Sequence, residues 1–305
     1  MGNHLKEVYT LSDLAEWSEV SRDLEFPARL AVIGDPVAHS RSPQMHNPAL
    51  RATGGNASYI RLHLREGELD EGIRLMEAAG FIGFNATIPH KSAVFERVDE
   101  MTETARRVGA VNTVAFREGR LIGHNTDAPG LQRAVKEAFS VDFCDLRILI
   151  VGAGGGAGRA ATVEAAMEGC RRLVLVNRTV SKAGELVREI ADLLPGEGRV
   201  VAVPWEDAEL ARELECTDLV INATSLGMKP DDRPVVPGHL LRARHLVYDM
   251  VYSPPETRFL EDARNSGAMC ANGLDMLLWQ GVLAFEFWFD REAPVEVMRR
   301  GLHGM

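Results

Sequence analysis

The sequence predicts an α/β protein whose C-terminal half folds as a doubly wound parallel sheet. Short apolar runs alternate with helix-like stretches through most of the 305 residues, a pattern typical of α/β architecture. In the second half, helical patterns separate most of the apolar runs. These runs span 147–151, 173–176, 199–203, 219–222 and 245–248. A glycine-rich turn directly follows the first of them, as in sheets of this kind that bind a dinucleotide.

The N-terminal half predicts a second α/β unit. The first 28 residues are expected to form a helical extension, in which Ser12 caps a helix over 13–20. A buried strand at 30–33 precedes a helix opened by Ser42-Pro43, with the serine as cap and the proline in the first helical position. Further strand signals lie at 58–64, 84–88 and 111–124, and a helical signal at 69–79. A helix over 129–139 precedes the second unit, and a last apolar helix over 275–287 could finish the second sheet or return to the first unit. The segment 111–124 is predicted as a hairpin that turns at Glu118-Gly119.

Composition and charge exclude several classes of function. The formal net charge of -10 repels nucleic acid and anionic membranes. The four cysteines are scattered without a CxxC pair, which indicates reduced thiols, and the nine histidines show no metal-ligand spacing. No apolar run approaches the roughly 20 residues that span a bilayer. We therefore expect a cytoplasmic monomer or homodimer that binds no nucleic acid, membrane or metal.

The glycine-rich turn predicts a dinucleotide site. The strand that ends at Val151 runs straight into Gly152-Ala153-Gly154-Gly155-Gly156 and the start of a helix. Gly152 permits the tight turn, Gly154 lets the backbone approach a pyrophosphate, and Ala157 is small enough for the helix to pack against the strand. The helix N-terminus offers N–H groups to phosphates. A flexible glycine loop without a ligand is the alternative.

The end of the next strand predicts which dinucleotide binds. Sites for NAD place Asp or Glu there to bond the ribose 2′-hydroxyl, whereas this chain has Asn177-Arg178-Thr179, with Lys182 a few residues on. Arg178 can grip a 2′-phosphate with two charge-assisted hydrogen bonds, Thr179 can donate its hydroxyl, and Lys182 adds a point charge. The sequence therefore predicts NADP, unless these cations are merely solvated.

Three segments of the first unit predict a substrate site. Ser40 and Ser42 flank a helix start, which suits a carboxylate. Lys91 follows a strand end and a proline turn, close after Thr87, and Asn112 and Asp127 lie at the two ends of the hairpin. Helix capping, a solvated lysine and turn-forming amides are the alternatives when each segment is taken alone.

Taken together, the three segments predict a site that handles a proton. Oxidation of a hydroxyl moves a hydride from carbon and a proton from oxygen, and a general base takes the proton. Lys91 can be that base, and Asp127 can hold it in place. A nearby carboxylate raises a lysine pKa, so either burial opposes that shift or the two groups share the proton. Both possibilities stay open.

The motifs together resemble the shikimate dehydrogenase family, from about Leu30 to the last predicted helix. The matching segments are Ser40-Arg-Ser42-Pro43, Asn85-Ala-Thr-Ile-Pro-His-Lys91, Gly109-Ala-Val-Asn-Thr113, Asn125-Thr-Asp127, Gly152-Ala-Gly-Gly-Gly156, Asn177-Arg-Thr179 and Asn222-Ala-Thr-Ser225. The resemblance implies the NADP-linked, reversible conversion of 3-dehydroshikimate to shikimate in aromatic amino-acid biosynthesis. It also implies a substrate domain and a Rossmann-type NADP domain with a cleft between them.

The resemblance assigns roles by position. Lys91 matches the proton acceptor and donor, with Asp127 beside it. The positions that match substrate contacts are Ser40, Ser42, Thr87, Lys91, Asn112, Asp127, Tyr252 and Gln280. Met250 and Gly273 match positions near the nicotinamide. The expected domains are a helical extension over 1–28, a catalytic substrate domain over 29–127 with 275–305, and the NADP domain over 128–274.

The chain departs from the family pattern at two positions and in its extension. Ala86 stands where valine is common, and His90 stands where phenylalanine is frequent. Relatives within the family act on quinate or aminoshikimate, and the paired serines favour shikimate. A remoter alternative is a non-catalytic, NADP-binding regulatory protein, which requires only the second unit and predicts no role for Lys91.

Overall fold

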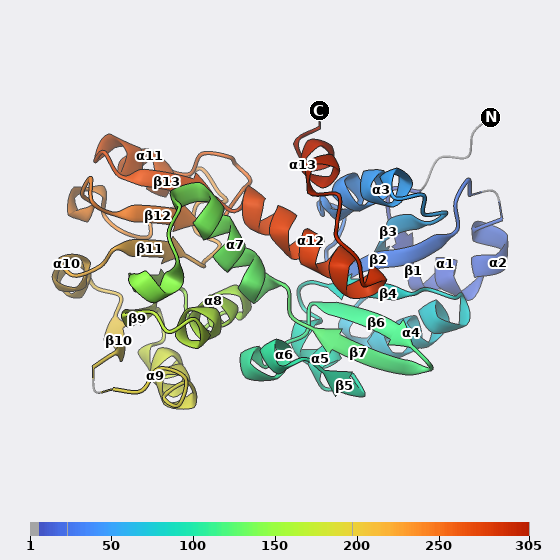
Figure 1. The fold of residues 1–305 in the computed structure, drawn as a ribbon, viewed down its shortest axis with the longest axis horizontal. Helices are drawn as coiled ribbons and strands as arrows, with labels where there is room; N and C mark the ends of the chain where they lie inside the picture. Colours follow the sequence, from blue (N-terminus) through green and yellow to red (C-terminus); the bar gives the residue numbers. More distant parts are fainter. Residues whose placement is uncertain (1–5, 23, 197, 305) are drawn as a thin grey trace. The chain divides into compact units, whose positions relative to one another are not determined.

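The computed structural model describes residues 6–22, 24–196 and 198–304. The chain divides into two compact units (Figure 1). The first contains the chain up to Thr126 together with the part from Gln280 onward, and the second contains Asp127–Trp279. Each unit is built around its own sheet.

The first unit contains a mixed sheet with the order β1-β3-β2-β4-β6-β7-β5. Its strands are β1 Tyr9–Thr10, β2 Ala28–Gly34, β3 Ser58–His63, β4 Gly83–Ala86, β5 Glu100–Met101, β6 Thr113–Arg117 and β7 Arg120–His124. The strands from β1 to β4 pair in parallel, whereas β6 pairs antiparallel with both β4 and β7. The predicted hairpin is confirmed, since Glu118 and Gly119 turn with positive φ between β6 and β7.

Helices and a 3-10 turn cover this sheet. They are α1 Leu11–Ala15, α2 Trp17–Val20, α3 Ser42–Ala52, η1 Glu66–Glu68, α4 Leu69–Ala78, α5 Lys91–Phe95, α6 Glu103–Val108 and α13 Val295–His303. The helices α3 and α13 lie side by side (Figure 1). Leu62, Leu64, Phe84 and Val114 are among the side chains buried in the core.

The N-terminal extension differs from the prediction because it adds a strand to the sheet. Its strand β1 pairs in parallel with β3, and α1 begins after Thr10 rather than after Ser12. The backbone N–H of Thr10 donates to Asp13 Oδ2 at 2.8 Å, so the two residues close the first turn as in a capping box. Tyr9 and Leu14 are buried. The extension therefore contributes to the core instead of lying on the surface as a helix alone.

The second unit contains a six-stranded sheet in which every pairing is parallel, with the order β10-β9-β8-β11-β12-β13. The strands are β8 Arg147–Val151, β9 Arg172–Asn177, β10 Val200–Pro204, β11 Leu219–Asn222, β12 Leu246–Asp249 and β13 Met269–Asn272. The predicted doubly wound sheet is confirmed. The strand order reverses beside β8, the position at which such sheets bind dinucleotides.

The helical elements of this unit are α7 Asp127–Phe139, η2 Phe143–Asp145, α8 Gly156–Met167, α9 Val180–Glu189, α10 Asp207–Leu214, η3 Gly238–Leu240 and α11 Arg258–Asn265. The apolar helix α12, Leu274–Phe289, begins in the second unit and ends in the first. Strand β13 was not predicted. It is an edge strand of four residues whose first side chain, Met269, is 51% exposed, so it lacks the buried apolar run of the central strands.

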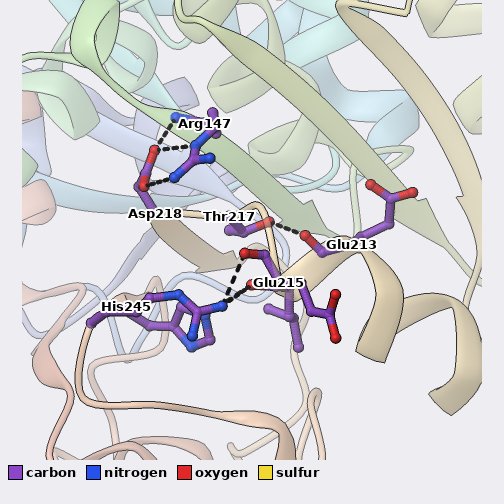
Figure 2. Close-up of polar contacts among 8 residues, drawn as sticks. Arg147, Glu213, Glu215, Thr217, Asp218 and His245 are labelled. Atoms are coloured by element: carbon purple, nitrogen blue, oxygen red, sulfur yellow. Dashed lines mark hydrogen bonds and ion pairs between the residues drawn. The ribbon is translucent and has the colours of Figure 1, made fainter.

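A polar cluster ties the amino ends of the central strands to the end of α10 (Figure 2). The Asp218 carboxylate accepts hydrogen bonds from the backbone N–H of Arg147 at 2.8 Å and from its guanidinium at 2.6 and 2.8 Å. Those bonds to Arg147 hold the pKa of Asp218 below its usual range. Beside them, Arg244 and the ring of His245 donate to the Leu214 carbonyl. The cluster thus supplies hydrogen-bond partners to backbone groups that have none within the strands and helix at whose ends they lie.

We expect Asp218→Ala to lower the free energy of unfolding by about 1–2 kcal/mol, because the change leaves the Arg147 backbone N–H and guanidinium without their acceptor. Urea unfolding measures this loss. Asp145→Ala is the matched control, since Asp145 pairs with Arg171 at 3.2 Å on the surface, where an ion pair contributes little. Equal losses in both variants would contradict a role for the cluster.

Candidate active site

The paired serines lie together between β2 and α3. The Ser40 hydroxyl donates to Ser42 Oγ at 3.2 Å and accepts from the Ser42 backbone N–H at 3.4 Å. The helix cap is Arg41, so Ser42 is the first helical residue, and the prediction that it caps the helix is wrong. Its hydroxyl is therefore not consumed by capping. Two hydroxyls at a helix N-terminus suit a carboxylate ligand.

The segment after β4 lies against the end of β2. The Thr87 backbone N–H donates to the Ile33 carbonyl at 2.9 Å, and the Asp35 N–H donates to the Ile88 carbonyl at 3.0 Å. A Cβ added to Gly34 would lie 2.5 Å from Thr87 Cγ2, so the two loops meet as closely as a glycine allows. The first unit thus brings the serine segment and the Thr87 segment to the same edge of the sheet.

Lys91 is the first residue of α5, and its side chain is half-buried. Its carbonyl accepts a hydrogen bond from the Val111 N–H at 3.1 Å, which ties the lysine to the segment before β6. The neighbouring His90 is buried and bonds through Nε2 to the Leu64 carbonyl at 2.7 Å. Because a carbonyl only accepts, this nitrogen is the protonated one. His90 therefore fastens the loop that presents Lys91.

Buried amides and hydroxyls connect the segments around Asn112. Asn85 Nδ2 donates to Thr113 Oγ1 at 2.9 Å, and Thr113 Oγ1 donates to Asn112 Oδ1 at 3.0 Å. Asn112 Nδ2 donates to Thr126 Oγ1 at 3.0 Å, and the Thr126 backbone N–H returns to Asn112 Oδ1 at 2.8 Å. Asn112 is only 2% exposed and fixes the backbone directly before Asp127.

The predicted substrate residues divide between the two units. Ser40, Ser42, Thr87, Lys91, Asn112 and Gln280 belong to the first unit. Asp127 is the first residue of α7 and belongs to the second unit, as does Tyr252. The roles of all eight residues stay predictions.

The glycine turn of the second unit adopts the expected strand–turn–helix geometry. Gly152 follows β8 with a φ of +91°, and its N–H donates to the Val176 carbonyl at 2.8 Å. Gly154, Gly155 and Gly156 are exposed at the start of α8. The most crowded position is Gly158 rather than Ala157, because a Cβ there would lie 2.1 Å from the Gly152 carbonyl oxygen. The sequence did contain a signal for this close contact, because a glycine, Gly158, directly follows Ala157.

The side chains predicted to select the cofactor lie just after β9. Asn177 Nδ2 donates to the Thr179 carbonyl at 2.9 Å and shapes the turn, while Arg178, Thr179 and Lys182 are exposed. Of these residues, Lys182 lines a cavity of 160 Å³, whose lining is completed by Ala153, Gly154, Arg159, Glu185, Leu186 and Glu189. Two of the lining residues form an ion pair, with 2.6 Å between Arg159 Nη1 and Glu189 Oε2. This pair was not predicted from the sequence.

A buried carboxylate organises the loop that contains Met250 and Tyr252. Asp249 at the end of β12 accepts from Asn222 Nδ2 at 2.8 Å, from the Val251 N–H at 3.0 Å and from the Thr257 hydroxyl at 2.6 Å. Burial raises the pKa of Asp249, although these hydrogen bonds oppose the rise.

Gly273 lies against the same loop. A Cβ at this position would lie 2.1 Å from the Met250 carbonyl oxygen, so only glycine fits there. Sequence reasoning placed Met250 and Gly273 near the nicotinamide, but it missed Asp249 as the group that fixes the loop. A polar residue at the end of a buried strand was the available signal.

Two features are absent from the described ranges 6–22, 24–196 and 198–304. There, no His, Cys, Asp and Glu side chains gather in a group of three or more that could hold a metal ion. No helix in those ranges combines the length and the apolar character needed to cross a membrane.

Family models match three stretches of the chain. Residues 32–114 match the shikimate dehydrogenase substrate binding domain, residues 133–228 match shikimate / quinate 5-dehydrogenase, and residues 273–302 match the shikimate 5′-dehydrogenase C-terminal domain. These stretches contain the paired serines, the Lys91 segment, the glycine turn and the last long helix.

Individual relatives show the same similarity over most of their length. A shikimate dehydrogenase (NADP(+)) from Methanopyrus kandleri is 41% identical over 275 residues, 90% of this chain and 94% of the relative. The crystal structure of a Thermus thermophilus shikimate 5-dehydrogenase with NADP(H) and shikimate has a TM-score of 0.80 and 36% identity, covering 91% of this chain and 99% of that one. A quinate dehydrogenase from Corynebacterium glutamicum, bound to NAD, has a TM-score of 0.79 and 32% identity, covering 90% and 98%.

Proposed function

The chain belongs to the shikimate dehydrogenase family, and from that membership we propose that it reversibly reduces 3-dehydroshikimate to shikimate with NADP. The observation that supports this most strongly is that each unit carries groups suited to one of the two reactants. One unit gathers hydroxyls, amides and a lysine at one sheet edge, and the other presents a glycine turn at the switch point of a doubly wound sheet.

The residues after the glycine turn and after β9 fit NADP. The exposed backbone of Gly154–Gly156 at the N-terminus of α8 suits a pyrophosphate. Arg178, Thr179 and Lys182 would hold the 2′-phosphate, and no carboxylate stands at the end of β9 to repel it. When bound, NADP supplies the hydride that reduces the ketone, or accepts it in the reverse direction.

The first unit would bind and protonate the other reactant. Ser40 and Ser42 would hold the carboxylate, while Thr87 and Asn112 would bind ring hydroxyls. As the ketone is reduced, Lys91 would donate a proton to the carbonyl oxygen, and in the oxidation it would take the proton back from the hydroxyl. Asp127 would orient Lys91 and contact the substrate, with Tyr252 and Gln280 as further contacts.

Quinate and aminoshikimate are the competing substrates. Quinate has an extra hydroxyl on the carbon that bears the carboxylate. The pocket around the carboxylate therefore decides between quinate and shikimate. The hydrogen-bonded pair Ser40 and Ser42 fixes both hydroxyls at that end and favours shikimate.

A substrate panel tests the assignment. Shikimate, quinate and aminoshikimate are each supplied with NADP and with NAD, and kcat/KM is measured from reduction of the cofactor. Shikimate with NADP is expected to give the highest kcat/KM. A higher value for quinate would move the chain to the alternative activity, and binding of NADP without turnover of any acid would indicate the regulatory alternative.

We predict that Asp127→Asn lowers kcat by about ten- to a hundredfold and leaves the Kd for NADP within about twofold. The amide keeps the shape of the side chain but removes the charge that, on this proposal, orients Lys91. Steady-state kinetics and a fluorescence titration with NADP measure the two effects. Asp207→Asn is the matched control, because Asp207 is likewise the first residue of a helix, α10, and is exposed. Equal losses of turnover and NADP binding would assign Asp127 a structural role instead.

A further inference from the structure

We propose that Tyr59 is a positioning residue, whose buried hydroxyl orients the amides of Asn85 and Asn112 in the substrate site. The proposal rests on the proposed function. Tyr59 lies in β3 and is fully buried.

The tyrosine ring is held rigidly from two sides. The imidazole of His46 stacks on it with ring centroids 4.5 Å apart and 10° between the planes, and Trp288 lies against it at 6.1 Å. The backbone of Tyr59 is clamped by Asn47 of α3, which accepts from its N–H at 2.8 Å and donates to its carbonyl at 3.0 Å. The position of the phenol oxygen is therefore set by α3 and β3 together.

The Tyr59 hydroxyl donates its proton to a carbonyl oxygen, which fixes the direction of this hydrogen bond. Burial raises the pKa of Tyr59, so the phenol stays neutral and has one O–H to donate. Its hydroxyl donates that proton to Asn85 Oδ1 at 2.7 Å.

The direction of the hydrogen bond from Tyr59 determines how the side-chain amides of Asn85 and Asn112 are oriented. Because Asn85 Oδ1 accepts from the phenol, its Nδ2 faces Thr113, and the Thr113 hydroxyl must then donate onward to Asn112 Oδ1. This places Asn112 Nδ2 toward Thr126 and leaves one of its two N–H groups for a ligand. The same phenol thus orders Asn85 directly and Asn112 through Thr113.

Tyr59→Phe tests this assignment, since it removes one oxygen and retains the stacked ring. The Asn85 carbonyl then loses its donor, so the chain of hydrogen bonds that orients Asn112 is weakened. We expect the KM for shikimate to rise by about tenfold, with kcat and the KM for NADP each changed by less than about twofold. Groups that bind substrate and transition state alike affect KM rather than kcat.

Tyr248→Phe is the matched control. Tyr248 is also fully buried, in β12 of the other unit, but no side chain of the described residues bonds to its hydroxyl. Removal of that oxygen should leave the KM for shikimate unchanged. A second variant, Asn85→Asp, keeps the acceptor for the phenol but can no longer donate to Thr113. Its effect on the KM for shikimate should therefore not add to that of Tyr59→Phe.

The outcomes separate this proposal from the proposed function. If the wild-type chain reduces no NADP with shikimate, the proposed function fails, and the role of Tyr59 fails with it. If the wild type is active and Tyr59→Phe leaves the KM for shikimate unchanged, only the role of Tyr59 is overturned. Equal increases in the KM for shikimate and for NADP would also overturn it, because they would indicate a general loss of structure.

Discussion

Replacing Lys91 with methionine is expected to lower kcat for shikimate oxidation by about a hundred- to ten-thousand-fold, the range over which a positioned general base or acid contributes. Methionine keeps much of the length of the lysine stem and cannot take or give a proton. Lys91 begins α5, and its backbone stays bonded to Val111 in the variant. The loss should therefore come from the missing amine alone.

Steady-state turnover, together with NADP binding followed by fluorescence, measures this effect. NADP affinity is expected to be unchanged, because the glycine turn and the segment 177–182 belong to the other unit. Lys136→Met is the matched control, since Lys136 is exposed and paired with Asp142 at 2.7 Å, and it should retain turnover within about twofold. Full activity in Lys91→Met would remove the lysine from the mechanism.

Replacing Arg178 with alanine is expected to weaken NADP binding by about 10- to 150-fold and to leave NAD binding unchanged. Each hydrogen bond to a charged group contributes about 1.5–3 kcal/mol, and only NADP has the 2′-phosphate that Arg178 would contact. Arg178 is exposed just after β9. Because Lys182 offers a point charge without a fork of donors, Lys182→Ala should have a smaller effect.

Calorimetric titration of both dinucleotides measures the ratio of the two Kd values. Arg171→Ala serves as the control, because Arg171 is also exposed but pairs with Asp145, and the ratio should not change. A parallel loss of NADP and NAD affinity in Arg178→Ala would show that the residue maintains the turn rather than recognising the phosphate.

The elements with strong local signals could be predicted from the sequence. The four central strands of the second unit are buried apolar runs and the edge strand β10 is an apolar run too, and the glycine turn directly follows β8, so both the sheet and the start of α8 were identified. The hairpin turn at Glu118-Gly119 was equally clear, since its conformation needs residues that tolerate positive φ. The edge strand β13 lacked such a signal.

Features that depend on distant partners could not be predicted. Ser42 followed by proline has the pattern of a helix cap, yet Arg41 takes that position and the Ser42 hydroxyl bonds to Ser40 instead. Tyr59 looked like any aromatic residue of a buried strand. Its role depends on Asn85, 26 residues further along the chain.

Strand β1 is a similar case. It exists only because β3 offers an edge to pair with, so two residues of the extension become a strand without a periodic pattern of their own. Asp249 is another case, because its role in fixing the loop depends on three hydrogen-bond donors from other parts of the chain. Local propensity decides such positions only weakly, and tertiary contacts decide them strongly.

The most direct measurement follows the hydride itself. Shikimate labelled with deuterium on the carbon whose hydroxyl is oxidised is incubated with the wild-type chain and NADP, and the reduced cofactor is examined by mass spectrometry. Deuterium in the nicotinamide ring is the predicted result, because hydride must pass from that carbon to the cofactor. Reduced cofactor without the label, or bound NADP that is never reduced, would contradict the account.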